Sequence, residues 1–177
     1  MSSIADFGVT HDVAVTLLVD NRADLLVKST KAVRYFTDAS LLAEHGFAAL
    51  IHLKGAGIRI LWDAGISCIE DDQAIVINVQ DKGLVIVSGC AHSGIVNTVN
   101  HGREISGVDR VWGVLGGFHL APATEEEISK TIAAIKAHAP RLVAPTHCTG
   151  FHAISRFAAE MPEAFVQGVV GATYFFC

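Results

Sequence analysis

The chain has 177 residues, of which 51% are hydrophobic and 18% are charged. This composition excludes a disordered tail or linker, because there is ample apolar surface to bury in a domain of ordinary size. The 13 basic and 18 acidic residues give a formal net charge of -5, which argues against nucleic-acid binding through charge alone. We therefore expect one domain over residues 1–177 that binds no nucleic acid.

Nothing in the sequence resembles a membrane or secretion signal. No apolar run approaches the roughly 20 residues that cross a bilayer, and the first residues lack a basic cluster followed by an apolar stretch. The four cysteines, Cys68, Cys90, Cys148 and Cys177, show no paired spacing, which is typical of free thiols in a reducing compartment. We expect a cytoplasmic protein that does not bind membranes.

The predicted strands come first along the chain. The apolar segments are short, rich in β-branched residues and separated by Gly, Asn and Asp, a pattern that predicts buried strands. Two pairs of segments are joined by short turns that contain glycine, so residues 47–62 and 73–87 are expected to form hairpins. The predicted strands cover residues 13–19, 47–53, 58–62, 74–79, 84–87, 111–115, 142–144 and 168–175.

Helices are predicted in the second half of the chain. Thr124 is followed by three glutamates, which is typical of a helix N-cap with an acidic first turn, and Pro140 marks the end of that helix. Strands followed by alternating strands and helices predict an α/β layered architecture, because near-continuous apolar strands need both faces covered. The predicted helices cover residues 93–105, 124–139 and 153–161.

Three histidines occupy the same local context. His92, His119 and His147 each follow an apolar strand and a small-residue turn, in LVIVSGCAHSG, VWGVLGGFHL and LVAPTHCTG. Functional side chains converge at the carboxyl ends of strands in α/β sheets, and three imidazoles with a water are a common catalytic zinc site. The sequence therefore predicts a metal site, with hydrogen-bonded loop residues as the alternative. Glycines that permit sharp turns and close approach stand at positions 89, 94, 116, 117 and 150.

Four further residues are candidates near this site. Asp63 ends a predicted strand, where it could hold a ligand imidazole by its N–H or simply form a turn. His152 follows His147 closely. Cys90 and Cys148 flank two of the histidines, and since neighbours on a strand point to opposite faces, we expect buried thiols, with metal ligation as the alternative. The other histidines are expected to be surface or packing residues: His11, His45, His52, His101 and His138.

In chain order, the segments EHGFAALI, ILWDAG, DDQAIVI, GLVIVSGCAHSGIVNTV, GGFHL and PTHCTG resemble one subfamily of the metallo-β-lactamase fold. It contains the dihydropterin ribofuranosyl-aminobenzene phosphate synthases of methanopterin biosynthesis, and the resemblance covers nearly the whole chain after about residue 13. It implies an αββα sandwich of two facing mixed sheets with helices outside and a metal site at one edge. It also implies that His92 and His147 are metal ligands, that His119 is a ligand where the superfamily often has a bridging Asp, and that Asp63 supports the site.

The chain departs from this family in one motif. The family carries His-x-His-x-Asp-His between the DAG turn and the DDQA strand, and no such motif occurs in these 177 residues. Because that motif supplies about half of the family's two-metal ligand set, we expect an internally shortened sandwich with at most one divalent metal per chain. Zinc is the expected metal, with manganese and iron as alternatives.

The leading functional interpretation is a metal-dependent hydrolase or pterin-synthase-like enzyme, acting through a metal-activated water or a Lewis-acid metal on a small phosphate ester or pterin-like molecule. The alternatives are a non-catalytic relative that binds a ligand or metal, and a thiol enzyme that uses Cys90 or Cys148. The ligand count predicts weak or absent turnover of generic phosphoesters and lactones, and metal binding that is lost as the imidazoles protonate. An uncovered sheet edge would be expected to pair with another copy of the chain.

Overall fold

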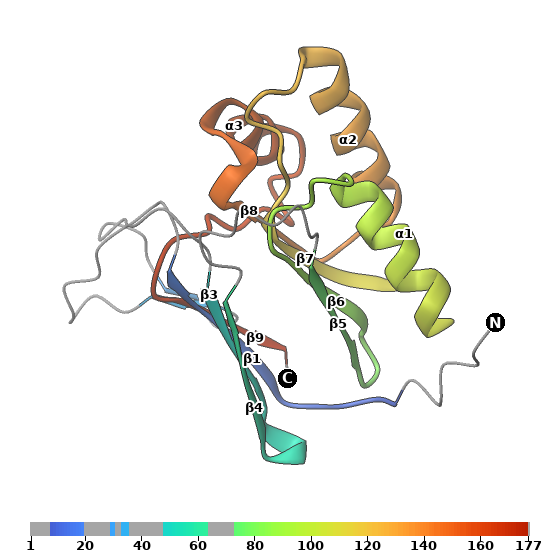
Figure 1. Cartoon of the computed structure of the whole chain (residues 1–177), viewed down its shortest axis with the longest axis vertical. Helices are drawn as coiled ribbons and strands as arrows, with labels where there is room; N and C mark the ends of the chain where they lie inside the picture. The colour runs from blue at the N-terminus through green and yellow to red at the C-terminus, as the bar shows by residue number, and fades with distance from the viewer. Residues whose placement is uncertain (1–7, 20–28, 31–32, 36–47, 64–72, 177) are drawn as a thin grey trace.

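The computed structural model describes residues 8–19, 29–30, 33–35, 48–63 and 73–176. In this part of the chain two β-sheets face each other, and three helices cover the outer face of one sheet (Figure 1). This layered mixture of strands and helices agrees with the predicted fold class. No helix among these residues is both long enough and apolar enough to span a bilayer.

The first sheet has five strands in the order β2-β9-β1-β3-β4, and every neighbouring pair in it is antiparallel. The expectation of two mixed sheets is therefore wrong for this one. Parallel neighbours need a long crossover, whereas β3 and β4 are joined by a short turn, as the predicted hairpin requires. The strands are β1 (Val13–Val19), β2 (Val33–Tyr35), β3 (Ala48–Leu53), β4 (Ile58–Asp63) and β9 (Ala172–Phe176).

The second sheet has four strands in the order β5-β6-β7-β8 and is mixed. The predicted hairpin of β5 and β6 is confirmed, and β6, β7 and β8 run parallel. The crossovers between the parallel strands are the helices α1 and α2, and α3 follows β8. The elements are β5 (Ala74–Val79), β6 (Gly83–Ser88), α1 (Ile95–Ser106), β7 (Val111–Gly117), α2 (Glu125–Ala137), β8 (Leu142–Thr146) and α3 (Phe151–Glu160).

The apolar residues of the second sheet divide between two cores because successive side chains on a strand point to opposite faces. On β6, Val85 and Val87 pack into the core between the sheets, together with Val15 and Leu17 of β1. Leu84 and Ile86 of the same strand pack into the core beneath the helices. Both faces of this sheet are thus buried, which explains the near-continuous apolar runs of its strands.

Element boundaries differ from the prediction where glycine is involved. The last strand begins at Ala172 and not at residue 168, because Gly171 has a φ of 82° and the Ala172 N–H donates to the carbonyl of Val169 in a turn. In the other direction, β7 continues through Gly116 and Gly117, which were expected to lie in the turn after it. The strand β2 was not predicted.

Candidate metal site at the carboxyl ends of the parallel strands

The carboxyl ends of β6, β7 and β8 meet at one edge of the four-stranded sheet, because the three strands are parallel. His92 lies in the loop after β6, His119 lies in the loop after β7, and His147 directly follows β8. The structure therefore places the three candidate histidines at adjoining strand ends, as the sequence pattern predicted.

His92 and His119 lie against each other. Their ring centroids are 4.6 Å apart and the ring planes are nearly perpendicular, at 86°. Both side chains are exposed to solvent. This pair joins the loop after β6 to the loop after β7.

The backbone at the strand ends takes an unusual conformation. Ala91, His119 and His147 have positive φ angles of 57°, 50° and 50°. This left-handed region is uncommon for residues other than glycine, and such residues concentrate at functional sites, where the surrounding structure holds them in place. One of them occurs after each of the three parallel strands, so the three strand ends share this backbone conformation.

His147 lies close to both candidate thiols. The Sγ atoms of Cys90 and Cys148 and a ring nitrogen of His147 all lie within 4.8 Å of one another. We call these three residues the thiol–imidazole cluster. His92 and His119 are not part of this group of ligand atoms.

The thiols of Cys90 and Cys148 can approach each other because β7, which lies between β6 and β8, ends in two glycines. β6 and β8 both pair with β7, so they are about 10 Å apart, which is twice the spacing of neighbouring strands. A Cβ atom on Gly117 would lie 2.9 Å from the Sγ of Cys148 and 3.1 Å from the Cα of Cys90, and would clash with the Gly89 carbonyl oxygen. Gly117 therefore provides the space in which the residues that follow β6 and β8 come into contact.

The thiol of Cys148 is held in its neutral form in the metal-free protein. Burial, together with the nearby Cys90, raises the pKa of Cys148 to about 12. The Sγ of Cys148 donates a hydrogen bond to the main-chain carbonyl oxygen of Cys90 at 3.2 Å. A neutral, hydrogen-bonded thiol is a poor nucleophile, so this geometry argues against the thiol-enzyme alternative for Cys148.

Thr149, which is fully buried, fixes the turn that carries His147 and Cys148. Its hydroxyl donates to the carbonyl oxygen of Thr146 at 2.6 Å and accepts from the N–H of Phe118 at 3.1 Å. The N–H of Ala121 also donates to the carbonyl oxygen of Cys148 at 3.2 Å. The loops after β7 and β8 are therefore held together by both side-chain and main-chain hydrogen bonds.

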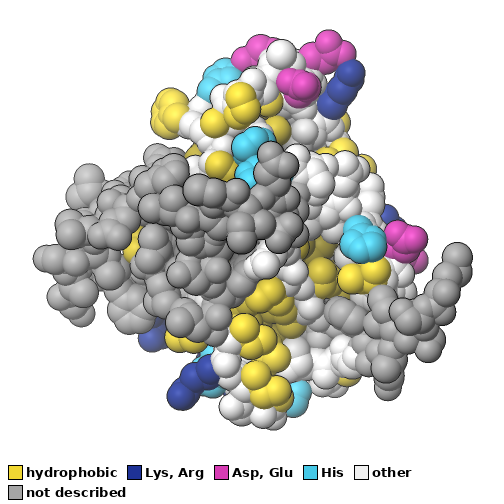
Figure 2. Space-filling model, in the orientation of Figure 1, with side chains coloured by type: hydrophobic (Ala, Val, Ile, Leu, Met, Phe, Trp, Pro, Cys, Tyr) yellow, Lys and Arg dark blue, Asp and Glu magenta, His cyan; other side chains and the backbone are white. Residues whose placement is uncertain are grey.

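Two other candidates are placed differently. His152 lies at the start of α3, where its ring contacts the carboxylate of Glu125, and Arg156 binds the same carboxylate at 2.7 Å. Glu125 belongs to the acidic first turn of α2, over which acidic side chains gather at the top of Figure 2. Asp63 ends β4, and its side chain lies outside the described residues, as do Cys68, Cys177 and His45.

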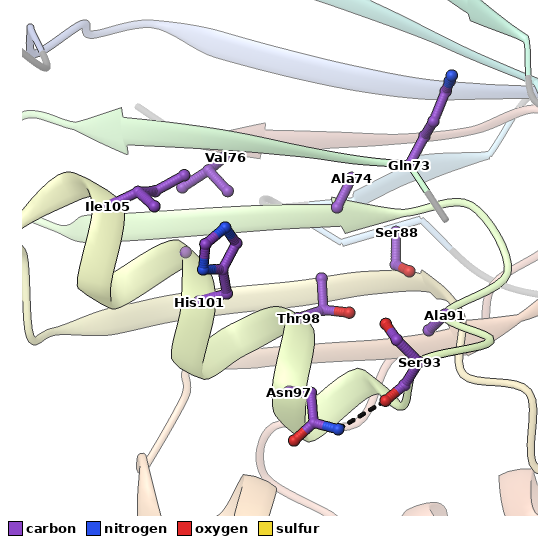
Figure 3. A pocket seen from close by; sticks show the side chains of 11 residues that line it. Gln73, Ala74, Val76, Ser88, Ala91, Ser93, Asn97, Thr98, His101 and Ile105 are labelled. Carbon is purple, nitrogen blue, oxygen red and sulfur yellow. Dashed lines mark hydrogen bonds between the residues drawn. The ribbon is translucent and has the colours of Figure 1, made fainter. Parts of the chain in front are cut away.

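A cavity of about 360 Å³ opens between α1 and the edge strand β5, beside the loop that carries His92 (Figure 3). Ser88, Ala91 and Ser93 line its end next to that loop, and Thr98 and His101 project into it from α1. The hydroxyl of Ser88 is buried and has no hydrogen-bond partner among the described residues. A sequence pattern gives little sign of such a cavity, because its walls come from a strand, a helix and a loop.

No family model matches the chain. The chain is 45% identical over 97 residues to 7,8-dihydropterin-6-methyl-4-(beta-D-ribofuranosyl)-aminobenzene-5'-phosphate synthase of Methanocaldococcus jannaschii, which covers 55% of this chain and 33% of that protein. It is 34% identical over 110 residues to an uncharacterized protein of the same organism, which covers 59% of this chain and 40% of the relative. The aligned part thus spans between a third and two-fifths of these curated relatives.

Similar solved structures include one that matches most of the chain. It is Tm1679, described as a metal-dependent hydrolase of the beta-lactamase superfamily, with a TM-score of 0.54 and 26% sequence identity. The match covers 86% of this chain and 56% of that one. This likeness confirms the fold class that the sequence motifs predicted.

Proposed function

Since the chain is a relative of the dihydropterin ribofuranosyl-aminobenzene phosphate synthases within the metallo-β-lactamase superfamily, we propose that it acts as a metal-dependent enzyme on a small molecule. The substrate class is a phosphate ester or a pterin-like compound, and zinc is the expected metal, with manganese or iron as alternatives. The observation that carries the proposal is the placement of His92, His119 and His147 at the adjoining carboxyl ends of three parallel strands.

The residues at this edge fit a divalent metal. Imidazole nitrogens and thiolate sulfurs are the donors that zinc prefers, and both kinds are present at the strand ends. The groups available to bind it are the three histidines predicted as ligands, His92, His119 and His147, and the thiols of Cys90 and Cys148 beside them. When bound, such a metal supplies Lewis acidity and lowers the pKa of a coordinated water.

The residues of the neighbouring cavity would position the substrate. The cavity beside the His92 loop has a volume within the range of small-molecule sites, about 300–1,000 Å³. We assign it to the part of the substrate next to the reacting group. Ser88, Asn97 and His101 line it with groups able to bind the polar edge of a pterin-like ring, while Val76 and Ile105 offer apolar contact. The buried hydroxyl of Ser88 supports this assignment, because a buried polar group without a partner is costly unless a ligand satisfies it.

Metal-supplemented turnover tests the proposal. The purified chain would be assayed with generic phosphoesters, and for formation of the dihydropterin compound after which the relative is named. His92→Ala and His147→Ala are the test variants, and His138→Ala is the control, because His138 is the C-cap of α2. Metal-dependent turnover that is lost in both test variants and kept in the control supports the proposal. Equal background activity from all four proteins contradicts it.

A second candidate function is binding without turnover. It is favoured by the absence of a His-x-His-x-Asp-His motif from these 177 residues, since that motif is expected to hold a second metal. Such a relative would bind a metal or a pterin-like ligand and show no metal-dependent activity in the assay above. Calorimetry with zinc and with a dihydropterin separates this outcome from a protein that binds neither.

A further inference from the structure

The thiol–imidazole cluster differs from the three-histidine ligand set in its geometry. Three ligand atoms, two of them sulfurs, lie within 4.8 Å of one another at Cys90, His147 and Cys148. In tetrahedral zinc sites with bonds of about 2.3 Å to sulfur and 2.0–2.1 Å to nitrogen, ligand atoms are separated by about 3.3–3.8 Å. Before any metal is bound, the separations between the three ligand atoms therefore exceed those of a tetrahedral zinc site by at most about 1.5 Å.

The surrounding structure is organised to hold these three side chains together. Gly117 leaves the space between the strand ends, and a Cβ atom there would meet Cys148 and Cys90. His147 and Cys148 belong to a short 3-10 turn, so they are not successive residues of a strand and do not point to opposite faces. The buried hydroxyl of Thr149 fixes that turn through two hydrogen bonds.

We propose that the chain binds its metal through the Sγ atoms of Cys90 and Cys148 and a ring nitrogen of His147. This inference rests on the proposed function only in the claim that a metal binds at this edge, and it replaces the expected three-histidine set with a two-sulfur, one-nitrogen set. The exposed pair His92 and His119 is then left at the rim of the site to contact the substrate.

The donor set defines the class of metal. Thiolates are soft ligands that select zinc and related metals, whereas manganese and magnesium prefer carboxylate, carbonyl and water oxygens. Two thiolates and an imidazole leave one position of a tetrahedral metal open. Both thiols lose their protons to solvent when the metal binds, because the thiolate is the ligand. This set therefore predicts strong preference for zinc over manganese.

X-ray absorption of the reduced, zinc-loaded chain tests this inference directly, because it counts sulfur neighbours without any substitution. The expected result is about one zinc per chain with two sulfur neighbours at about 2.3 Å. Cys90→Ser and Cys148→Ser should each remove one sulfur neighbour and weaken zinc binding by more than about tenfold. Mutation of a residue that only supports a metal ligand already weakens metal binding by about 10- to 100-fold. His92→Ala and His119→Ala are the matched variants, and they should keep the zinc and both sulfurs.

The outcomes separate this inference from the proposed function. A zinc shell of nitrogen and oxygen alone, with binding lost in His92→Ala, overturns the inference and leaves the metal-dependent function standing. A chain that binds no zinc contradicts both. Melting temperatures of the zinc-free variants show whether a serine variant lost its metal because it unfolded. If a variant does unfold, the sulfur count in the unsubstituted protein still decides whether the two thiols bind the zinc.

Discussion

The Sγ of Cys148 lies 3.2 Å from the carbonyl oxygen of Cys90, to which it donates a hydrogen bond, although the two residues follow strands that are not neighbours. The contact bridges β6 and β8 across the end of β7, where Gly116 and Gly117 present no side chains. It brings two thiols and an imidazole together at the edge of the sheet where functional groups converge. The proposed two-sulfur, one-nitrogen metal site depends on that contact.

Gly117→Ala is expected to disrupt the contact. The new Cβ atom would clash with the Gly89 carbonyl and crowd Cys148 at 2.9 Å, and overpacking of this kind costs about 1–3 kcal/mol. Chemical denaturation measures the loss. Gly113→Ala on the same strand is the control, because a Cβ atom there meets Phe176 at an ordinary 3.5 Å and should leave stability nearly unchanged. Equal effects of the two variants would refute the steric role of Gly117.

Cys148 is expected to alkylate slowly in the metal-free protein. With a pKa of about 12, only about 10⁻⁴ of the thiol is ionised at pH 8, whereas an unfolded cysteine is ionised far more. Mass spectrometry of iodoacetamide-treated protein over a range of pH measures the rate at this site. Rapid modification of Cys148 at pH 8 in the native state would show that the thiol is not held neutral.

The same raised pKa makes stability depend on alkaline pH. Between the ordinary thiol pKa of 9.0 and the folded value of about 12, the unfolded chain binds fewer protons than the folded one, so stability falls as pH rises. Below that window the contribution is fully present. Cys148→Ser should show a shallower fall in melting temperature across this range than the unsubstituted chain. Identical pH profiles for the two proteins would contradict the assignment.

Two threonines three residues apart offer a matched pair of substitutions. Both are fully buried, but the hydroxyl of Thr149 makes two hydrogen bonds, while that of Thr146 has no partner among the described residues. Thr149→Val should therefore cost about 1–3 kcal/mol, because it leaves the Phe118 N–H unsatisfied. Thr146→Val should be neutral or stabilising. Denaturant unfolding compares them, and a larger loss for Thr146→Val would reverse the interpretation of this turn.

The start of α2 provides a test remote from the site. Thr124 accepts from the N–H of Glu127, whose carboxylate in turn accepts from the Thr124 N–H, forming a capping box. The N–H and the hydroxyl of Thr124 both donate to the Glu127 carboxylate and lower the pKa of Glu127, so the contribution of this carboxylate to stability is lost as pH falls through that lowered value. Thr124→Ala should cost about 1 kcal/mol. Glu126→Gln, which removes only an exposed ion pair with Lys130, should change stability far less.

Much of the fold was predictable because its strands and helices follow simple periodicities. β1 and β5 were predicted with their exact bounds, and both hairpins are confirmed. β2 was missed because three residues, Val33–Tyr35, are too few to show an alternating pattern, and they form a strand only by pairing with β9. Long-range pairing of this kind leaves no local signal.

The site was predictable only in part. The repeated strand–turn–histidine context correctly located His92, His119 and His147 at adjoining strand ends. Metal ligation by Cys90 and Cys148 was only the alternative prediction, because Cys148 was treated as a strand residue whose neighbour would point away, whereas it lies in a 3-10 turn. The glycine pair before FHL was the available signal, since it permits contact across β7.

The central claim is that a metal binds where β6, β7 and β8 end. A crystal grown with zinc, with anomalous diffraction collected above and below the zinc absorption edge, tests it most directly. The account predicts a single strong anomalous peak within bonding distance, about 2.0–2.3 Å, of Cys90, His147 and Cys148. A zinc-loaded crystal with no peak at this edge of the sheet, or with its peak elsewhere on the chain, would contradict it.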